Sequence, residues 1–358
     1  ISVRLTDLGV VGIGKRRIVV AAVRRHALAD RGNGAGIVRR FDVCNGDADG
    51  LCAVVQWRLH EPAAATLLTG LKREIELLRR VPAAAADEVL VCDLSMQRNQ
   101  EPLRRLLEAG VRVRYFDHHQ AGDVPDHPLL DAHLDFGADA CTSLLVDRFL
   151  GGSARAWAAV GAYGDALEEV GDRLAGSLGL GEARRRQLRQ LGEAINYNAY
   201  GEDAGDVRIA PADLYRIMIR YHDPLDMCAV EPIAAVLDRL RRDDLVQALA
   251  VEPVLQTARC AVRFLPDLSW SRRAIGCLAN EVARAHPGQA QAVLKATRAG
   301  DFTVSVRAPL DAPAGAAQLC ARFGGAGRAA AAGIDRLPAA DVQRFVEAFE
   351  AAEWLAVG

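Results

Sequence analysis

The apolar segment 111–116 ends at three consecutive polar residues, Asp117, His118 and His119. Its β-branched and aromatic side chains predict a buried strand of a parallel sheet, and such strands present chemical groups at their carboxyl ends. Two adjacent histidines are, by themselves, more typical of a surface position or a satisfied half-buried pair than of a site. The meaning of this pair therefore depends on the residues that end the neighbouring strands.

Acidic residues follow three further segments with the same pattern. They are Asp47 and Asp49 after the predicted strand 37–43, Asp93 after 88–92, and Asp165 after the small apolar stretch 156–162. Carboxylates gathered at the ends of neighbouring strands repel one another and raise each other's pKa unless a cation lies among them. A divalent metal ion is the economical explanation for such a group.

The composition sets limits on the ligand and on the compartment. The chain has 358 residues, of which 51% are hydrophobic and 25% charged, and this is ordinary for a globular protein large enough for two domains. The net charge of −2 means that a polyanion must bind in a local basic cleft, so long duplex DNA is not an expected ligand. Eight cysteines without a CxxC pair, together with the lack of a long apolar run, predict a cytoplasmic protein with no membrane contact.

Alternating strand and helix patterns predict an α/β protein with four regions. Residues 1–36 form a basic extension that is expected to be dispensable, and 37–168 form a domain with a doubly wound, mainly parallel sheet. Residues 169–255 form a helical connector, and 256–358 form a smaller α/β domain. Within the first domain, 72–80 is predicted to be an amphipathic helix.

Several polar residues have two readings from sequence alone. Lys72 and Arg73 lie near a predicted strand end, where they either contact phosphate or belong to a solvated face. Thr142 and Ser143 fit a helix start whatever the function. The glycines of 323–327 precede an alanine run that favours a helix, so this loop is either an anion nest or a plain turn.

The order of the acidic motifs, DxD, then D, then DHH, then GD, resembles the four motifs of the DHH phosphoesterase superfamily. In this sequence they are Asp47 with Asp49, Asp93, residues 117–119, and Gly164 with Asp165. The resemblance extends from Ile37 to about residue 350 and implies a DHH-type catalytic domain followed by a DHHA1-like substrate-binding domain. It also implies a hydrolase with a bound metal.

The resemblance implies two divalent cations, with Mn²⁺ preferred and Mg²⁺ as the alternative. The first ion is expected at Asp47 and Asp93, and the second at Asp49, Asp93, His118 and Asp165, so that Asp93 bridges the two. Carboxylates with one imidazole suit these ions better than they suit Zn²⁺.

The remaining candidate residues surround these ligands. His119 is expected to face the substrate phosphate, which makes Asp93, His118 and His119 the candidate catalytic residues, and Asp117 is expected to orient an imidazole. Asn45 stands where many relatives have a histidine or an aspartate that completes the first metal site. A neutral amide brings no charge, so metal occupancy at the first site is in doubt.

The glycine-rich loop of the second domain departs from the GGGH pattern of the superfamily at two positions. Gly325 and Gly327 match, whereas Ala326 replaces a glycine and Arg328 replaces the histidine. Arginine is always charged and offers a planar fork for phosphate, so Arg328 is predicted to be a phosphate clamp, together with the two glycines and His119.

The leading functional hypothesis is a phosphodiesterase that uses metal-activated water on short oligonucleotides, dinucleotides or other small phosphate esters. One alternative is a phosphoanhydride hydrolase for polyphosphate or pyrophosphate, because several chemistries share this fold. Another is a nucleotide-binding regulatory protein with little turnover, which is motivated by Asn45 and Arg328. The sequence leaves the oligomeric state open, a homodimer included.

Overall fold

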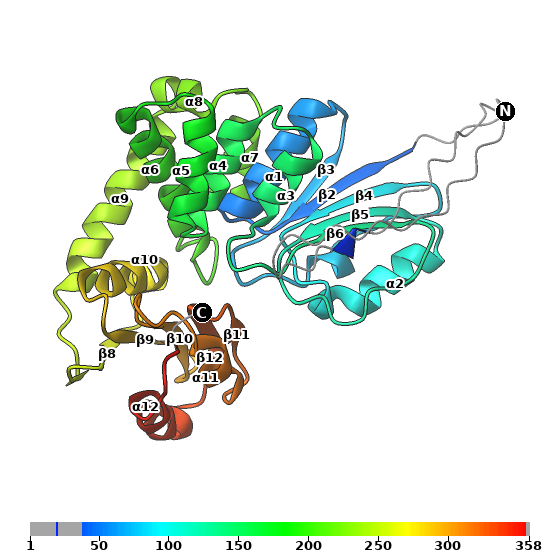
Figure 1. Ribbon diagram of the computed structural model, residues 1–358. Helices are drawn as coiled ribbons and strands as arrows, with labels where there is room; N and C mark the ends of the chain where they lie inside the picture. The colour runs from blue at the N-terminus through cyan, green and yellow to red at the C-terminus, as the bar shows by residue number, and fades with distance from the viewer. Residues whose placement is uncertain (1–18, 21–37, 356–358) are drawn as a thin grey trace, which may run out of the picture.

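The computed structural model describes Val19–Val20 and residues 38–355, which form two sheets with a region of helices between them (Figure 1). This arrangement confirms the predicted α/β fold class, with a mainly parallel sheet first and a mixed sheet, also of six strands, at the C-terminal end. Most of the predicted extension 1–36 lies outside the described residues. None of the helices described here combines the length and apolar character that a membrane crossing requires.

The N-terminal sheet has the strand order β1-β6-β5-β4-β2-β3. Its parallel strands are β2 (Arg40–Cys44), β3 (Thr66–Thr69), β4 (Glu88–Cys92), β5 (Arg112–Asp117) and β6 (Leu130–Leu134). The two-residue strand β1 (Val19–Val20) pairs antiparallel with β6. The chain runs from β2 to β3 on one side and then returns to β4 on the other side, so the order reverses between β2 and β4. Open α/β sheets bind ligands at the carboxyl ends of strands at such a reversal.

Helices cover both faces of this sheet, and the side chains of each strand alternate between two apolar cores. In β4, Leu90 and Cys92 pack in a core that includes α1 (Ala48–His60), α3 (Thr142–Phe149) and α4 (Arg155–Gly164). Val89 and Val91 pack in the opposite core, beneath α2 (Gln100–Glu108). Figure 1 shows α2 on the opposite side of the sheet from α1, α3 and α4. A strand buried on both faces has a continuous apolar sequence, which is why these strands were predictable.

A helical region follows α4 and leads to the second sheet. Its members are α5 (Glu168–Ser177), α6 (Glu182–Ala199), α7 (Pro211–Met218), α8 (Pro224–Val230) and α9 (Pro232–Leu249). Proline begins three of them, because the first turn of a helix needs no N–H donor from that residue. Figure 1 shows α9 extending from α8 toward the second sheet, so this helix spans the distance between the two lobes.

The C-terminal sheet has the order β11-β12-β10-β9-β8-β7 and is mixed, since β8 and β9 run parallel while its other pairs are antiparallel. Its strands are β7 (Leu255–Gln256), β8 (Cys260–Leu265), β9 (Ala290–Ala296), β10 (Phe302–Arg307), β11 (Ala326–Gly327) and β12 (Ala331–Leu337). The helices α10 (Ser269–Ala285), α11 (Ala316–Ala321) and α12 (Val342–Glu350) pack against it.

Two predicted helices are wrong. The segment 72–80 has only a turn and the short 3-10 helix η1 (Leu77–Arg80), because its polar groups bond to other elements: the amide of Lys72 donates to the carbonyl of Ala199 in α6, and Asn99 bonds to Ile75 and Leu78. The alanine run after Arg328 is strand β12, paired with β10 and β11. In both places tertiary pairing overrides the local propensity.

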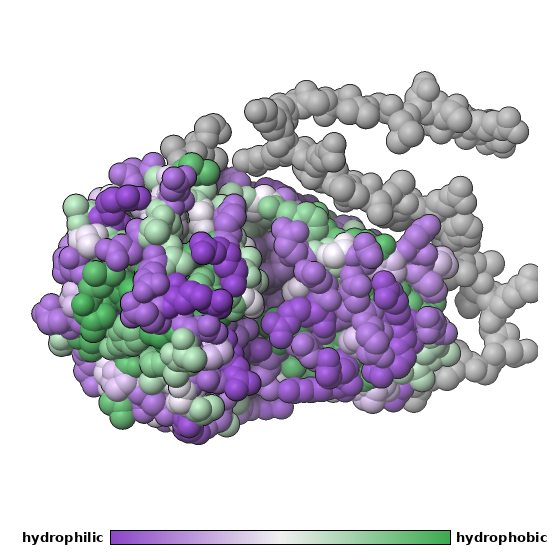
Figure 2. All heavy atoms as spheres, turned by 90° about the horizontal axis from the view of Figure 1, so that it is seen from below, coloured by the Kyte–Doolittle hydropathy of each residue, from purple (hydrophilic) through white to green (hydrophobic). Residues whose placement is uncertain are grey.

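The surface agrees with the nearly balanced charge of the chain. On the face shown in Figure 2, hydrophilic side chains predominate and hydrophobic ones form smaller areas. With a net charge of −2, the whole molecule does not attract polyanions. Any attraction for a phosphate group must therefore come from individual basic side chains close to the site.

Candidate metal centre

Three neighbouring parallel strands deliver polar residues to one edge of the first sheet. Asp47 follows β2 as the N-cap of α1, where its side chain accepts a hydrogen bond from the amide of Gly50 (3.0 Å), and Asp49 lies in the first turn of that helix. Asp93 follows β4, and His118 follows β5. These four sequence-predicted residues therefore come together, as the strand pattern indicated.

Asp165 reaches the same place by another route. It was grouped with the strand ends, but the small apolar stretch 156–162 before it also suits a buried helix, and Asp165 is the C-cap of helix α4. Helix α4 packs so closely on α1 that a Cβ at Gly164 would lie only 2.3 Å from Cβ of Ala48. The glycine permits this approach and so brings the carboxylate of Asp165 to the sheet edge.

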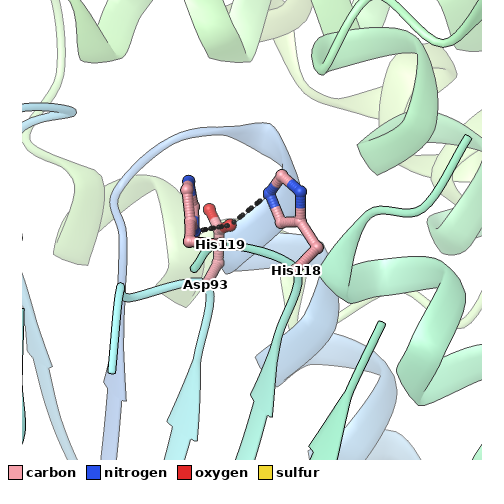
Figure 3. Close-up of side chains that lie close together, drawn as sticks. All are labelled: Asp93, His118 and His119. Atoms are coloured by element: carbon pink, nitrogen blue, oxygen red, sulfur yellow. Dashed lines mark ion pairs between the residues drawn. The ribbon is translucent and has the colours of Figure 1, made fainter. Parts of the chain in front are cut away.

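The ring nitrogen Nε2 of His118 faces three carboxylates. It lies 3.2 Å from Asp93 Oδ1, 3.6 Å from Asp165 Oδ2 and 3.9 Å from Asp49 Oδ2, and the His118 side chain is only 6% exposed. His119 lies on the other side of Asp93, as Figure 3 shows, with its Nδ1 3.9 Å from Asp93 Oδ1. Among the described residues, two overlapping groups have the spacing of metal ligands, and both contain His118.

The electrostatics of the acids favour a bound cation. Burial, followed by the neighbouring carboxylates of Asp165 and Asp47, raises the pKa of Asp49 to about 6. Burial and the same kind of repulsion raise the pKa of Asp93 well above its ordinary value. Asp93 also has a φ of 60°, in the left-handed region that few non-glycine residues adopt. Such strained backbone is typical of functional sites, and oxygen donors with one imidazole are a suitable ligand set for Mn²⁺ or Mg²⁺.

The amino end of α3 holds Asp49 in place. Its Oδ2 accepts from the amide of Thr142 (2.7 Å), and its Oδ1 accepts from the amide (2.8 Å) and the hydroxyl (2.5 Å) of Ser143. Thr142 and Ser143 do start a helix, as expected, but their link to Asp49 was missed. Since 93 residues separate Asp49 from Thr142, no local sequence signal could have indicated it.

Asp117 orients one of the two histidines, and that histidine is His119. Nδ1 of His119 lies 2.7 Å from Oδ1 of the buried Asp117. Burial alone lowers the pKa of His119, but the carboxylate of Asp117 outweighs burial and raises it above its ordinary value. The His119 side chain is 43% exposed, so its imidazole is presented at the surface of the site.

Lys72 is the clearest residue that the sequence left undecided. Its ammonium forms an ion pair with Asp47 Oδ2, donates to Asn196 Oδ1 (3.1 Å) and lies 3.9 Å from Asp165 Oδ1. Burial lowers the pKa of Lys72, but Asp47 and the other nearby acids raise it well above its ordinary value. Lys72 is therefore a fixed positive charge inside the acidic cluster and not part of a solvated face.

Asn45, the other uncertain residue of the first motif, is occupied by local hydrogen bonds. Its Oδ1 accepts from the amide of Asp47 (3.2 Å), and its Nδ2 donates to the carbonyl of Lys72 (3.1 Å). Both polar atoms of the side chain therefore have backbone partners, and Asn45 orders the segments that carry Asp47 and Lys72.

Arg328 extends from the C-terminal lobe to the candidate metal centre at the edge of the N-terminal sheet. Its Nη2 donates to Asp165 Oδ2 (2.6 Å) and to the carbonyl of Ala140 (3.1 Å), and it lies 2.9 Å from Nδ1 of His118. Burial raises the pKa of Asp165, but Arg328 and then His118 outweigh burial and hold it well below its usual range. Both lobes thus contribute to one site.

The glycine-rich loop that carries Arg328 is a hairpin and not a helix start. A Cβ at Gly325 would lie 2.3 Å from the carbonyl oxygen of Gly333, and Gly327 has a φ of 150°. The amide of Gly325 donates to Cys320, and the amide of Arg328 donates to Ala331. The glycines therefore serve close strand pairing, and their expected contact with phosphate remains a prediction.

Comparisons with known proteins give matches of structure only. No family model matches the chain, and no curated protein matches it in sequence. A DHH-domain protein described as a member of a family of ribosomal proteins has a TM-score of 0.64 at 14% identity, with 89% of this chain and 88% of that chain covered. RecJ from Thermus thermophilus in complex with Mn²⁺ has a TM-score of 0.58 at 20% identity, covering 89% of this chain and 53% of that chain. A manganese-bound exonuclease RecJ has a TM-score of 0.55 at 20% identity, covering 87% and 89%. Taken with the order of its strands and acidic residues, these matches show that the chain has the DHH-superfamily phosphoesterase fold.

Proposed function

We propose that this chain is a metal-dependent phosphoesterase that hydrolyses phosphodiester bonds in short oligonucleotides or small nucleotides. The observation that carries the proposal is the ring of carboxylates around Nε2 of His118, provided by Asp49, Asp93 and Asp165. These donors fit a divalent cation, and the two RecJ proteins of the same fold are described as manganese-bound, which supports Mn²⁺. When bound, such an ion supplies Lewis-acid chemistry to a phosphate ester.

Two side chains next to this ring suit a phosphate group. The exposed imidazole of His119, whose pKa is raised, donates a hydrogen bond to a phosphate oxygen or a proton to a leaving oxygen. The guanidinium of Arg328 offers further donors in a planar fork. His119 lies beside Asp93 and Arg328 beside Asp165, so a phosphate bound to a cation in the carboxylate ring would lie close to both.

A small polar pocket, with room for about one water molecule, lies next to Asp165. Residues from both lobes and from the helical region line it, among them Gly164, Asn196, Tyr200, Asn280 and Arg284. The ring of Tyr200 lies under the ammonium of Lys72 and packs against Gly276. The choice between a phosphodiester and a phosphoanhydride substrate therefore rests on the hydrolysis screen described next.

The test is a hydrolysis screen with Mn²⁺ over dinucleotides, short oligonucleotides and polyphosphate. We expect nucleotide release that depends on the metal and is lost in Asp93→Asn, because asparagine tolerates the left-handed backbone at this position while removing the charge. The matched control is Asp123→Asn, an exposed acid in the loop after the histidines, which should retain activity. Release of phosphate from polyphosphate alone would support the first alternative. Tight nucleotide binding without hydrolysis would support a regulatory protein.

A further inference from the structure

The ammonium of Lys72 is paired with Asp47, the acid that the resemblance assigns to the first ion. We infer that Lys72 replaces that ion, so that the chain binds one divalent cation, at the His118 ring, and uses a fixed lysine in place of a second. This inference rests on the proposed function and specifies its metal content. It differs from the two ions that the resemblance implies.

The first argument is that Asp47 is already paired with a positive side chain. Its Oδ1 accepts from the amide of Gly50, at the start of α1, and its Oδ2 is paired with the ammonium of Lys72. In the part of the chain that the structure describes, the groups of residues with metal-ligand spacing contain Asp49, Asp93 and Asp165 but not Asp47. The acid expected to hold the first ion already has a cation.

The second argument is that the remaining first-site position is also in use. Asn45 spends both polar atoms of its side chain on nearby backbone, at Asp47 and Lys72. A ligand at this position would have to break a hydrogen bond that fixes the loop. In this chain a neutral amide at Asn45 therefore occurs together with the positive side chain of Lys72 beside Asp47.

The third argument is that contacts with α6 fix Lys72 beside Asp47. Its amide donates to the carbonyl of Ala199 (2.9 Å), its ammonium donates to Asn196, and the ammonium lies 5.4 Å from the ring centre of Tyr200. All three partners lie at the carboxyl end of α6 or directly after it. The ammonium lies between Asp47 and Asp165, and it would repel a divalent ion bound to Asp47 on that side.

The experiment counts bound manganese directly. The purified 358-residue chain is equilibrated with Mn²⁺ and the bound metal is measured per chain, and electron paramagnetic resonance separates an isolated ion from two ions that share a carboxylate. We expect one Mn²⁺ per chain with the spectrum of an isolated ion. In the double variant Asn45→His with Lys72→Ala, which frees Asp47 and supplies an imidazole ligand, we expect two and a coupled spectrum.

The control is Arg73→Ala, which removes the adjacent positive charge on the same loop. Arg73 contacts Thr303 and Asp335 of the C-terminal lobe and no residue of the acidic cluster, so its loss should leave the count at one. Two ions in the wild-type protein would overturn the inference and leave the proposed function intact. A count of one in the double variant, with its fold verified by circular dichroism, would also overturn it. A wild-type count of zero would instead remove the metal centre, and with it the proposed function.

Discussion

Arg328→Ala should change metal affinity and substrate affinity in opposite directions. In the structure, Arg328 Nη2 donates to Nδ1 of His118, which leaves the proton of a neutral imidazole on Nε2. A metal ion on Nε2 requires that proton to be on Nδ1, where it would meet the N–H of Arg328. A cation held at Nε2 of His118 would therefore compete with the guanidinium for His118 and Asp165, and we expect Arg328 to leave these two residues when the ion binds.

The size of the effect follows from the bonds that the ion must break. A charge-assisted hydrogen bond is worth about 1.5–3 kcal/mol, and we use the lower end because the Arg328 side chain is 28% exposed. A difference of about 1.4 kcal/mol is tenfold in a binding constant, so Arg328→Ala should bind Mn²⁺ about tenfold more tightly. If the displaced guanidinium then holds substrate phosphate, the KM of the variant should rise by about tenfold or more for the same reason.

Isothermal titration calorimetry with Mn²⁺ measures the first effect, and steady-state kinetics at saturating metal measures the second. Arg322→Ala is the control, because Arg322 is an exposed arginine of the same lobe. Unchanged or weaker Mn²⁺ binding in Arg328→Ala would refute the competition. An unchanged KM would refute the phosphate contact.

Three further predictions concern the fold around the site. The metal-free protein should lose stability as the pH rises from about 4 to 6, because the pKa of Asp49, raised to about 6, penalises the charged folded state in that range. Melting temperatures in chelator at pH 4.5 and 7.5 would measure this loss, and an equal loss in Asp49→Asn would contradict its assignment to Asp49. Gly164→Val should cost about 2 kcal/mol or more, since a Cβ there meets Ala48 at 2.3 Å. Gly176→Ala, inside helix α5 and with no atom closer than 3.5 Å to the added Cβ, should not lower the melting temperature. Truncation before Ile37 should preserve the N-terminal sheet apart from β1, because its parallel strands begin at Arg40; a large drop in melting temperature would show that the strand pair between β1 and β6 matters.

The sequence predicts those parts of the site that lie directly after strands. Asp47, Asp93 and His118 each follow a run of apolar residues, and the carboxyl ends of parallel strands meet at one edge, so their proximity follows from a local pattern. The side chain of Asp93 is nevertheless only 3% exposed, because other elements pack over this strand end. The pattern gives the position of a strand end but not what packs over it.

The residues that come from other elements could not be placed in the same way. Lys72 reaches Asp47 because its loop is bonded to the end of α6, and Arg328 reaches Asp165 because a hairpin from the second lobe lies over the first. Neither path has a periodic signal, and the alanine run beside Arg328 locally favours the wrong element. These placements depend on contacts between segments far apart in the chain.

The charges of the centre connect the metal content with the role of Arg328. Asp47, Asp49, Asp93 and Asp165 carry four negative charges when ionised, and Lys72 and Arg328 supply two positive charges through ion pairs with the first and last of these acids. One divalent ion at the His118 ring neutralises the remainder. If the ion displaces Arg328 from Asp165, the guanidinium becomes an unpaired positive charge at the site, and a phosphodiester with its single negative charge is the complementary ligand. The ammonium of Lys72 also donates to Asn196 of α6, and its amide donates to Ala199 of the same helix. We therefore expect Lys72 to keep its ion pair with Asp47, and Arg328 to exchange between Asp165 and the substrate.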